Sequence, residues 1–296
     1  MNVALALDVD RDAPFPKPGL VHGVSLPLLS RDVADLQHPG KSALFEGTIK
    51  GLQYILDELD IPIPKIFFLE GRTALHLKNN FPDLLSRIKG ANSIIGFHGM
   101  DHEDLVGAES NVPMTLEASL ETLSKGMRAI HAATGIRPSI FRAPYMRISN
   151  ALLNKLTTLG INADSSLYLE TTKPPAPYRI SNQSVPLWEI PVVKYPENQQ
   201  KFIYMYLWPL FERKRPLEDY IRVLHNLSQN ENPTEEIGLC LVNLHPWHLA
   251  YSIMEKRYLS NSELAENFLF LRSIIDDMLS YGEIKFHLPG QEDFLV

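Results

Sequence analysis

The chain has 296 residues, of which 45% are hydrophobic and 21% charged, and its formal net charge is -7. These values are typical of a globular protein with a sizeable core, and the acidic balance disfavours nucleic acid or an anionic membrane as a partner. The single cysteine, Cys240, excludes an intrachain disulfide and a thiolate metal cluster, and its apolar surroundings are typical of a core residue.

The first ten residues have no basic segment and no small-residue cleavage site, so we do not expect a signal peptide. No apolar run approaches the roughly 18 residues of a membrane span. The aromatic run at residues 201–211 is too short and contains Pro209. We therefore expect a cytoplasmic protein without a membrane span.

Short apolar runs alternate along the chain with longer amphipathic segments. The apolar runs predict strands at residues 2–9, 64–71, 92–99, 138–144, 161–166, 187–193, 238–245 and 283–288. Helical spacing and capping residues predict helices at residues 42–60, 79–90, 115–135, 149–160, 216–230 and 261–282. This alternation predicts parallel strands joined by helical crossovers, in a closed or nearly closed α/β barrel.

We expect a single domain over residues 1–296, because no linker, repeat or low-complexity tract divides the chain. Residues 11–43 are a proline-rich insertion between the first strand and its helix. Loops of this length are usually functional or disordered.

Polar residues follow the carboxyl ends of several predicted strands, which is where parallel β/α proteins gather their chemistry. They are Asp8, Asp10, His98, His102, Arg142, Asp164 and His245. Each has a structural alternative: an aspartate can cap a turn or a helix, an arginine can join a buried ion pair, and a histidine can simply end a strand. Their occurrence together at one rim favours a functional site.

The spacing of these residues indicates a metal site. Asp8 and Asp10 are two apart and share a face if the strand continues through them. His98 and His102 are four apart, so a helical turn would point both imidazoles the same way. One carboxylate with two neutral imidazoles suits Zn²⁺, with Co, Ni, Fe or Mn as alternatives, and leaves coordination positions open for water and substrate.

The order of the motifs ALDVD, HGMDH, RAPY, DSS and LVNLH resembles that of the polysaccharide deacetylase superfamily (NodB homology, carbohydrate esterase family 4). The similarity extends from about residue 3 to residue 247. It implies an irregular (β/α)7 barrel, with Asp10, His98 and His102 binding a divalent metal that is commonly zinc.

The resemblance also implies roles for the remaining motif residues. Asp8 would be the general base, and Arg142 would pair with it and keep it ionised. The backbone N–H of Tyr145 would help to form the oxyanion site. His245 would be the general acid, and Asp164 would tune it.

Two departures from the secreted carbohydrate enzymes bear on the substrate. Val9 separates the two aspartates and Arg11 follows them, a pattern that resembles the branch of allantoinase-like proteins and non-secreted peptidoglycan deacetylases. This branch also points to a homo-oligomer. If the insertion at 11–43 covers the site, small amides are admitted more easily than chitin or peptidoglycan chains.

We therefore expect a metal-dependent hydrolase of linear amide C–N bonds, an N-deacetylase acting on an amino sugar, a glycan or a related small amide. A hydrolase of small cyclic amides is one alternative. Phosphoester hydrolysis is a second, disfavoured because the dipeptide Asp101-His102 has the reverse of the expected order. A metal- and carbohydrate-binding module without turnover is a third, disfavoured because metal binding alone requires neither Asp8 nor His245.

Other polar residues near the motifs are expected to have no catalytic role. Trp247 could stack on a sugar ring, line an acyl pocket or pack in the core. We expect Asp12, His22 and His38 in solvent-exposed loops, and Asp101, Glu103 and Asp104 either in solvent or beside the histidines. We expect structural positions for His248 and His287.

Overall fold

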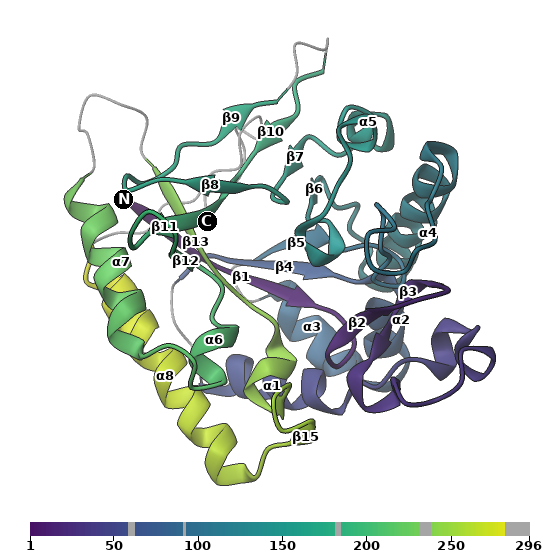
Figure 1. Cartoon of the computed structure of the whole chain (residues 1–296), viewed down its shortest axis with the longest axis horizontal. Helices are drawn as coiled ribbons and strands as arrows, with labels where there is room; N and C mark the ends of the chain where they lie inside the picture. Colours follow the sequence, from purple (N-terminus) through teal and green to yellow (C-terminus); the bar gives the residue numbers. More distant parts are fainter. Residues whose placement is uncertain (59–62, 91–92, 181–184, 231–237, 282–296) are drawn as a thin grey trace.

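The computed structural model describes residues 1–58, 63–90, 93–180, 185–230 and 238–281. Its centre is a curled eight-stranded sheet (Figure 1). The strands, in spatial order, are β13 (Leu239–Leu244), β1 (Asn2–Val9), β4 (Lys65–Leu69), β5 (Ser93–Phe97), β6 (Ile140–Phe141), β7 (Ala163–Asp164), β10 (Trp188–Glu189) and β9 (Tyr178–Arg179). Neighbouring strands are parallel except β9, which is antiparallel to β10.

Helices flank this sheet, and α7 and α8 pack against each other on one side of it (Figure 1). The helices are α1 (Glu46–Glu58), α2 (Gly71–Asn80), α3 (Pro82–Gly90), α4 (Leu116–Thr134), α5 (Asn150–Leu153), α6 (Trp208–Phe211), α7 (Leu217–Gln229) and α8 (Asn261–Leu279). Capping explains the bounds of α4: the Thr115 side chain accepts from Ala118 N, and Gly135 ends the helix at φ 79°.

The remaining strands form three smaller sheets among the described residues. One contains β8 (Tyr168–Glu170), β11 (Val192–Pro196) and β12 (Phe202–Tyr204), and the two hairpins are β2 (Pro14–Lys17) with β3 (Leu20–Ser25) and β14 (Tyr251–Ser252) with β15 (Arg257–Tyr258). Just after β12, Tyr206 pairs in parallel with Asn243 of β13. This pairing extends the curled sheet beyond β13, as expected for an irregular, nearly closed barrel.

Alternation along β1 explains how Asp8 reaches the interior of the barrel. Val3, Leu5, Leu7 and Val9 belong to the large core cluster beneath the helices, whereas Ala4 and Ala6 belong to a smaller cluster on the other face of the sheet. Asp8 continues the row of Ala4 and Ala6. Ala4 and Ala6 therefore lie on one face of the sheet, and Asp8 continues that row at the carboxyl end of the strand.

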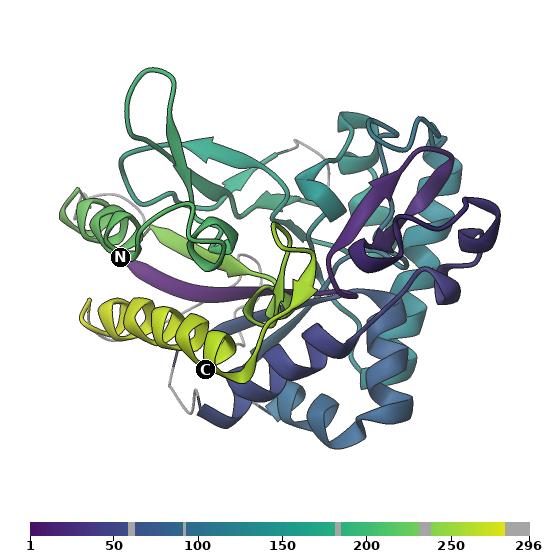
Figure 2. The same ribbon diagram turned by 60° about the horizontal axis from the view of Figure 1, so that its bottom comes forward.

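The insertion at 11–43 is ordered rather than structureless. It contains the hairpin β2–β3 and three short 3-10 helices, Leu26–Leu28, Ala34–Leu36 and Pro39–Lys41. Figure 2 shows the hairpin (purple) standing beside the end of β1. Its strand β3 is joined to the loop after β5 by the bridge between His22 and Glu103, and Gly23 N donates to His102 O at 2.9 Å.

Most predicted elements are confirmed, with some differences. Helix α2 was not predicted, because its segment opens on Gly71 and has no side-chain cap. The segments at 149–160 and 187–193 are each divided into two shorter elements. The strand predicted at 283–288 and His287 lie outside the described residues. Within the described ranges, no helix is long and apolar enough to cross a membrane.

Candidate metal and catalytic site

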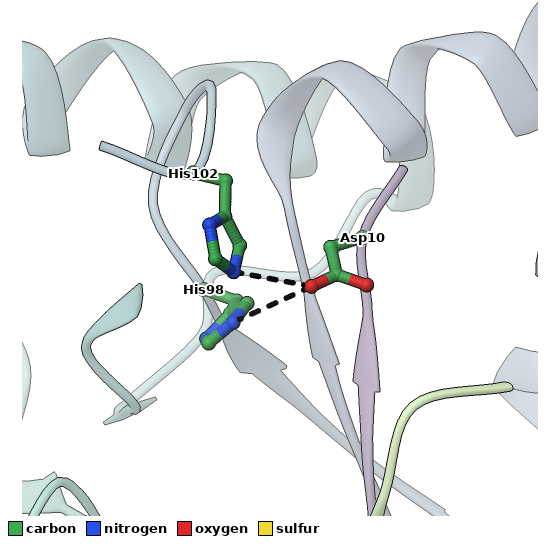
Figure 3. A group of neighbouring side chains, drawn as sticks. All are labelled: Asp10, His98 and His102. Atoms are coloured by element: carbon green, nitrogen blue, oxygen red, sulfur yellow. Dashed lines mark ion pairs between the residues drawn. The ribbon is translucent and has the colours of Figure 1, made fainter. Parts of the chain in front are cut away.

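Asp10, His98 and His102 come together at the carboxyl ends of β1 and β5, although 88 residues or more separate the aspartate from the histidines in the chain. All three are buried, and one ligand atom from each lies within 4.8 Å of the others. Asp10 Oδ2 lies 3.1 Å from His102 Nε2 and 3.9 Å from His98 Nε2 (Figure 3). The cluster expected from the sequence is therefore present.

A tight loop, rather than the expected helical turn, orients the two imidazoles. Gly99 has φ 80° and His102 has φ 52°, both in the left-handed region. Buried Glu103 braces the loop, because its carboxyl group accepts hydrogen bonds from Met100 N at 3.1 Å and Asp101 N at 2.8 Å. A Cβ on Gly99 would lie 2.6 Å from Glu103 Oε2, so glycine is required there.

The free nitrogen atoms of this cluster fit a metal ion. His98 Nδ1 bonds the carbonyl of Arg142 at 2.9 Å, which leaves Nε2 unprotonated and facing Asp10. Within the described structure, His98 Nε2 and both ring nitrogens of His102 are buried without a hydrogen-bond partner. Burial lowers the pKa of His98 to about 4 and that of His102 below its usual value, so both are neutral, as metal ligands must be. The cluster could hold a divalent metal.

Asp8 is held by two donors beside this cluster. Arg142 Nη1 donates to Asp8 Oδ1 at 2.9 Å, and the Tyr206 hydroxyl donates to Asp8 Oδ2. Burial alone would raise the pKa of Asp8, but Arg142, His98 and His245 outweigh it and hold that pKa below its usual range. Asp8 is therefore a carboxylate, and the ion pair that the resemblance implied is present.

Arg142 is itself fixed in place. Its Nε and Nη2 donate to the carbonyl and hydroxyl of Ser165 at 3.1 and 2.9 Å, and its guanidinium lies 4.2 Å from the ring centre of Phe68. Arg142 is fully buried, so these contacts hold a desolvated cation against Asp8.

His245 bridges the two aspartates. Its Nδ1 lies 3.0 Å from Asp10 Oδ2, and its Nε2 lies 3.9 Å from Asp8 Oδ2. Burial disfavours the charged imidazole, but Asp10 and Asp8 outweigh burial and raise the pKa of His245 above its usual value. Trp247 Nε1 donates to Asp10 Oδ1 at 2.9 Å, so the same carboxylate is fixed from a second side.

Asp164 does not meet His245, and the expected pairing of the two is wrong. Its carboxylate accepts from Ser166 N at 3.1 Å and from Ser166 Oγ at 2.8 Å. It faces Glu189 across the β7–β10 pair, since these two residues are in register. Asp164 therefore supports the Ser165-Ser166 turn that orients Arg142, and the carboxylates beside His245 are Asp10 and Asp8.

Tyr145 and Trp247 both line a cavity of about 360 Å³ that opens onto Asp8, His98, His102 and His245. Tyr145 and Met146 have φ values of 58° and 54°, a strained backbone conformation for residues other than glycine. The Tyr145 hydroxyl donates to His102 O at 3.3 Å. Trp247 is buried and lines the cavity, so it joins the site and does not belong to the core beneath the helices.

Two residues expected on the surface are buried. Asp12 accepts from Gly47 N and Thr48 N, at 2.8 and 2.7 Å, and so satisfies the free amides at the start of α1. His22 is buried under the insertion, with Nε2 3.1 Å from Leu36 O. His38 is exposed, as predicted.

Tyr206 and His248 also line the site, although the sequence predicts neither of them there. Tyr206 lies in the aromatic run at residues 201–211. His248 lines the cavity and packs on Trp247, with ring centres 3.7 Å apart. Its position three residues after His245 was the available signal.

Comparison with solved structures shows the same fold. A polysaccharide deacetylase homologue from Mycobacterium smegmatis matches with a TM-score of 0.58 and 22% identity, over 93% of this chain and 84% of that one. Puue allantoinase matches with a TM-score of 0.55 and 14% identity, over 93% and 84%. A 4-alpha-glucanotransferase from Thermococcus litoralis matches with a TM-score of 0.57 and 12% identity, over 93% of this chain but 37% of that one.

The family comparison agrees with the fold. Residues 47–163 match the model of the polysaccharide deacetylase family, and no curated protein sequence matches the chain. The fold is thus an irregular (β/α) barrel of the NodB type. Residues 47–163 are therefore similar to the polysaccharide deacetylase family, and the solved structures show the fold alone.

Proposed function

We propose that the protein is a metal-dependent hydrolase of linear amide C–N bonds, an N-deacetylase of an amino sugar, a glycan or a related small amide. The observation that carries the proposal is the placement of Asp8 and His245 around the Asp10–His98–His102 cluster. A carboxylate and a raised-pKa imidazole open onto one cavity with the candidate metal ligands.

Asp10, His98 and His102 would hold the metal, and their donor set suits zinc best. When bound, the ion would polarise the acyl carbonyl and acidify a water molecule. Asp10 also forms hydrogen bonds with His245 and Trp247. These contacts fix the carboxylate in one orientation.

Asp8 would accept the proton of the attacking water. Arg142 and Tyr206 donate to its two oxygens, which keeps the group ionised and fixes its plane. Each carboxylate oxygen retains a second lone pair, so a proton can still be taken. The N–H of Tyr145 would stabilise the oxyanion that develops as water adds to the carbonyl carbon.

His245 would donate a proton to the departing nitrogen as the C–N bond breaks, so that a carboxylic acid and an amine are released. An amide nitrogen leaves poorly as an anion, which makes this proton necessary. Asp10 and Asp8 favour the imidazolium form that can supply it. In this account Asp164 acts only through Ser165, Ser166 and Arg142.

Asp8→Asn tests the proposal against a module that binds without turnover. The metal-loaded protein should release acetate from N-acetylated compounds, and a chelator should abolish the release. Asp8→Asn should retain its metal content but lose about 10²–10⁴-fold in kcat, while the exposed control Asp35→Asn should match the wild type. Full activity of Asp8→Asn would refute the assignment of the base. Metal binding without turnover on any amide would favour the module.

A further inference from the structure

We infer that the substrate is a small amide with an apolar body and a carboxylate at its far end, rather than a glycan. This inference rests on the proposed function and narrows it to one class of amine component. It follows from the side chains that surround the cavity beyond the reaction centre.

The cavity wall is mainly apolar and comes from segments that are distant in sequence. Phe15 belongs to the hairpin of the insertion, Ile253 follows β14, and Trp208 begins α6. Phe15 and Ile253 pack on the buried cluster formed by Ala13, Trp247 and Tyr251. The two hairpins therefore form one continuous apolar surface beside the reacting groups, and it favours an apolar ligand.

Three hydrogen-bonding side chains in the same wall are committed to protein partners, whereas both ring nitrogens of His248 are buried without one among the described residues. The Tyr206 hydroxyl donates to Asp8, the Tyr145 hydroxyl to His102 O, and Trp247 Nε1 to Asp10. Aromatic walls can stack on sugars, but the hydroxyls at the ring edge of a sugar still need partners. A sugar has several hydroxyls, and the His248 imidazole can replace only part of the hydrogen bonds to water that a glycan would lose here, which is unfavourable.

Lys214 supplies a positive charge at the rim. It is exposed, its Nζ lies 4.8 Å from the ring centre of Trp208, and it is the only lysine or arginine among the described residues that line the cavity. Its neighbours Arg213 and Arg215 have carboxylate partners in Glu266 and Glu197, at 3.0 and 3.4 Å. Among the described residues, no carboxylate lies within 4.0 Å of Lys214 Nζ, so an anionic substrate group can take that place.

The test compares acetate release from matched N-acetyl compounds. The compounds are para-(acetamidomethyl)benzoate, its neutral amide para-(acetamidomethyl)benzamide, N-acetylglucosamine and diacetylchitobiose. We expect kcat/KM to be highest for the benzoate, lower for the benzamide and lowest for the two sugars. Calorimetric titration of the same compounds into metal-loaded Asp8→Asn should give the same order of affinity without turnover.

Two variants locate the preference. Lys214→Glu should lower kcat/KM for the benzoate by about tenfold and change that for the benzamide much less, whereas the exposed control Lys201→Glu should change neither. Phe15→Ala should lower kcat/KM for both benzyl compounds by about tenfold or more, with little effect on the sugars.

The outcomes separate the inference from the proposed function. Acetate release from the sugars at least as efficient as from the benzoate would overturn the inference and leave the hydrolase intact. Equal rates for benzoate and benzamide, unchanged by Lys214→Glu, would overturn the role of the carboxylate. If no compound is hydrolysed but Asp8→Asn binds them in the expected order, the proposed function fails while the predicted ligand class stands.

Discussion

Tyr206 donates its hydroxyl hydrogen to Oδ2 of Asp8, a residue 198 positions earlier in the chain. The bond forms because the segment after β12 pairs with β13, which brings Tyr206 over the end of β1. Arg142 occupies the other oxygen of the same carboxylate. The general base of the proposed reaction is therefore held at both oxygens by groups from two distant strand ends.

Tyr206→Phe should slow the reaction without removing the metal. A hydrogen bond to a charged group is worth about 1.5–3 kcal/mol, so we expect kcat to fall about 10- to 150-fold. Metal content, measured by mass spectrometry, should equal that of the wild type. Tyr54→Phe, on α1 and outside the cavity, is the matched control. Unchanged kcat in Tyr206→Phe would show that Arg142 alone positions Asp8.

Arg11 should prove important for folding although it touches no reacting group. It is fully buried, pairs with Glu70 at 2.5 Å and Asp101 at 3.2 Å, and donates to Gly23 O of the hairpin at 3.1 Å. Breaking a buried pair costs about 3–5 kcal/mol, so Arg11→Met should lower the unfolding free energy by that order in urea titrations. The exposed ion pair between Lys50 and Glu46 supplies the control, and Lys50→Met should change the unfolding free energy little.

The same substitution should loosen the insertion locally. Hydrogen exchange at β2–β3 should accelerate in Arg11→Met relative to exchange in α7, which packs against α8 and β12. Equal protection of the hairpin in both proteins would contradict the role assigned to Arg11.

Glu189 should make stability depend on pH. Burial and the neighbouring Asp164 carboxylate raise its pKa well above the unfolded value of 4.5, so folding favours the protonated form. The stabilisation it confers is complete below about pH 4.5 and is lost as the pH rises toward the folded pKa, by up to about 1.4 kcal/mol per unit. Glu189→Gln keeps the shape without the proton and should become more stable than the wild type as the pH rises from 6 to 8.

Glu189→Ala provides the contrast, because it also removes the acceptor of Leu167 N, now bonded to Glu189 Oε1 at 3.0 Å. It should unfold at lower temperature than the wild type at every pH. Parallel melting curves of the wild type and Glu189→Gln between pH 6 and 8 would contradict the raised pKa.

Sequence period and local chemistry predict much of this fold. A strand period of two places Asp8 on the face of Ala4 and Ala6, and the caps at Thr115 and Gly135 define α4 within a residue. The order of the motifs predicts that Asp10 lies beside His98 and His102. These features depend on neighbours in sequence or on the general rule that parallel strands end at one edge.

Partners from distant segments were beyond such reasoning. The sequence near Asp12 predicts a solvent-exposed side chain. The backbone amides that donate to its carboxylate lie at the start of α1, 35 and 36 residues away. Asp164 was paired with the wrong group because only the register of β7 with β10 places it opposite Glu189. Tyr206 depends on the irregular pairing after β12, which no local pattern indicates.

Metal should stabilise the protein through the buried imidazoles. An ion that binds only the folded state at 100 times its Kd adds about 2.7 kcal/mol to the unfolding free energy. Zinc should therefore raise the melting temperature of the wild type, and His98→Ala should lose that increase. His38→Ala, at an exposed histidine, should keep it. An equal zinc response in His98→Ala would place the ion elsewhere.

The most direct test of the central claim is an anomalous difference map from a zinc-soaked crystal, recorded on both sides of the zinc absorption edge. We expect one strong peak about 2.0–2.2 Å from Asp10 Oδ2, His98 Nε2 and His102 Nε2. Asp8 and His245 should lie beside the peak without binding the ion. A peak that omits Asp10 or either histidine, or no peak at this cluster, would contradict the account.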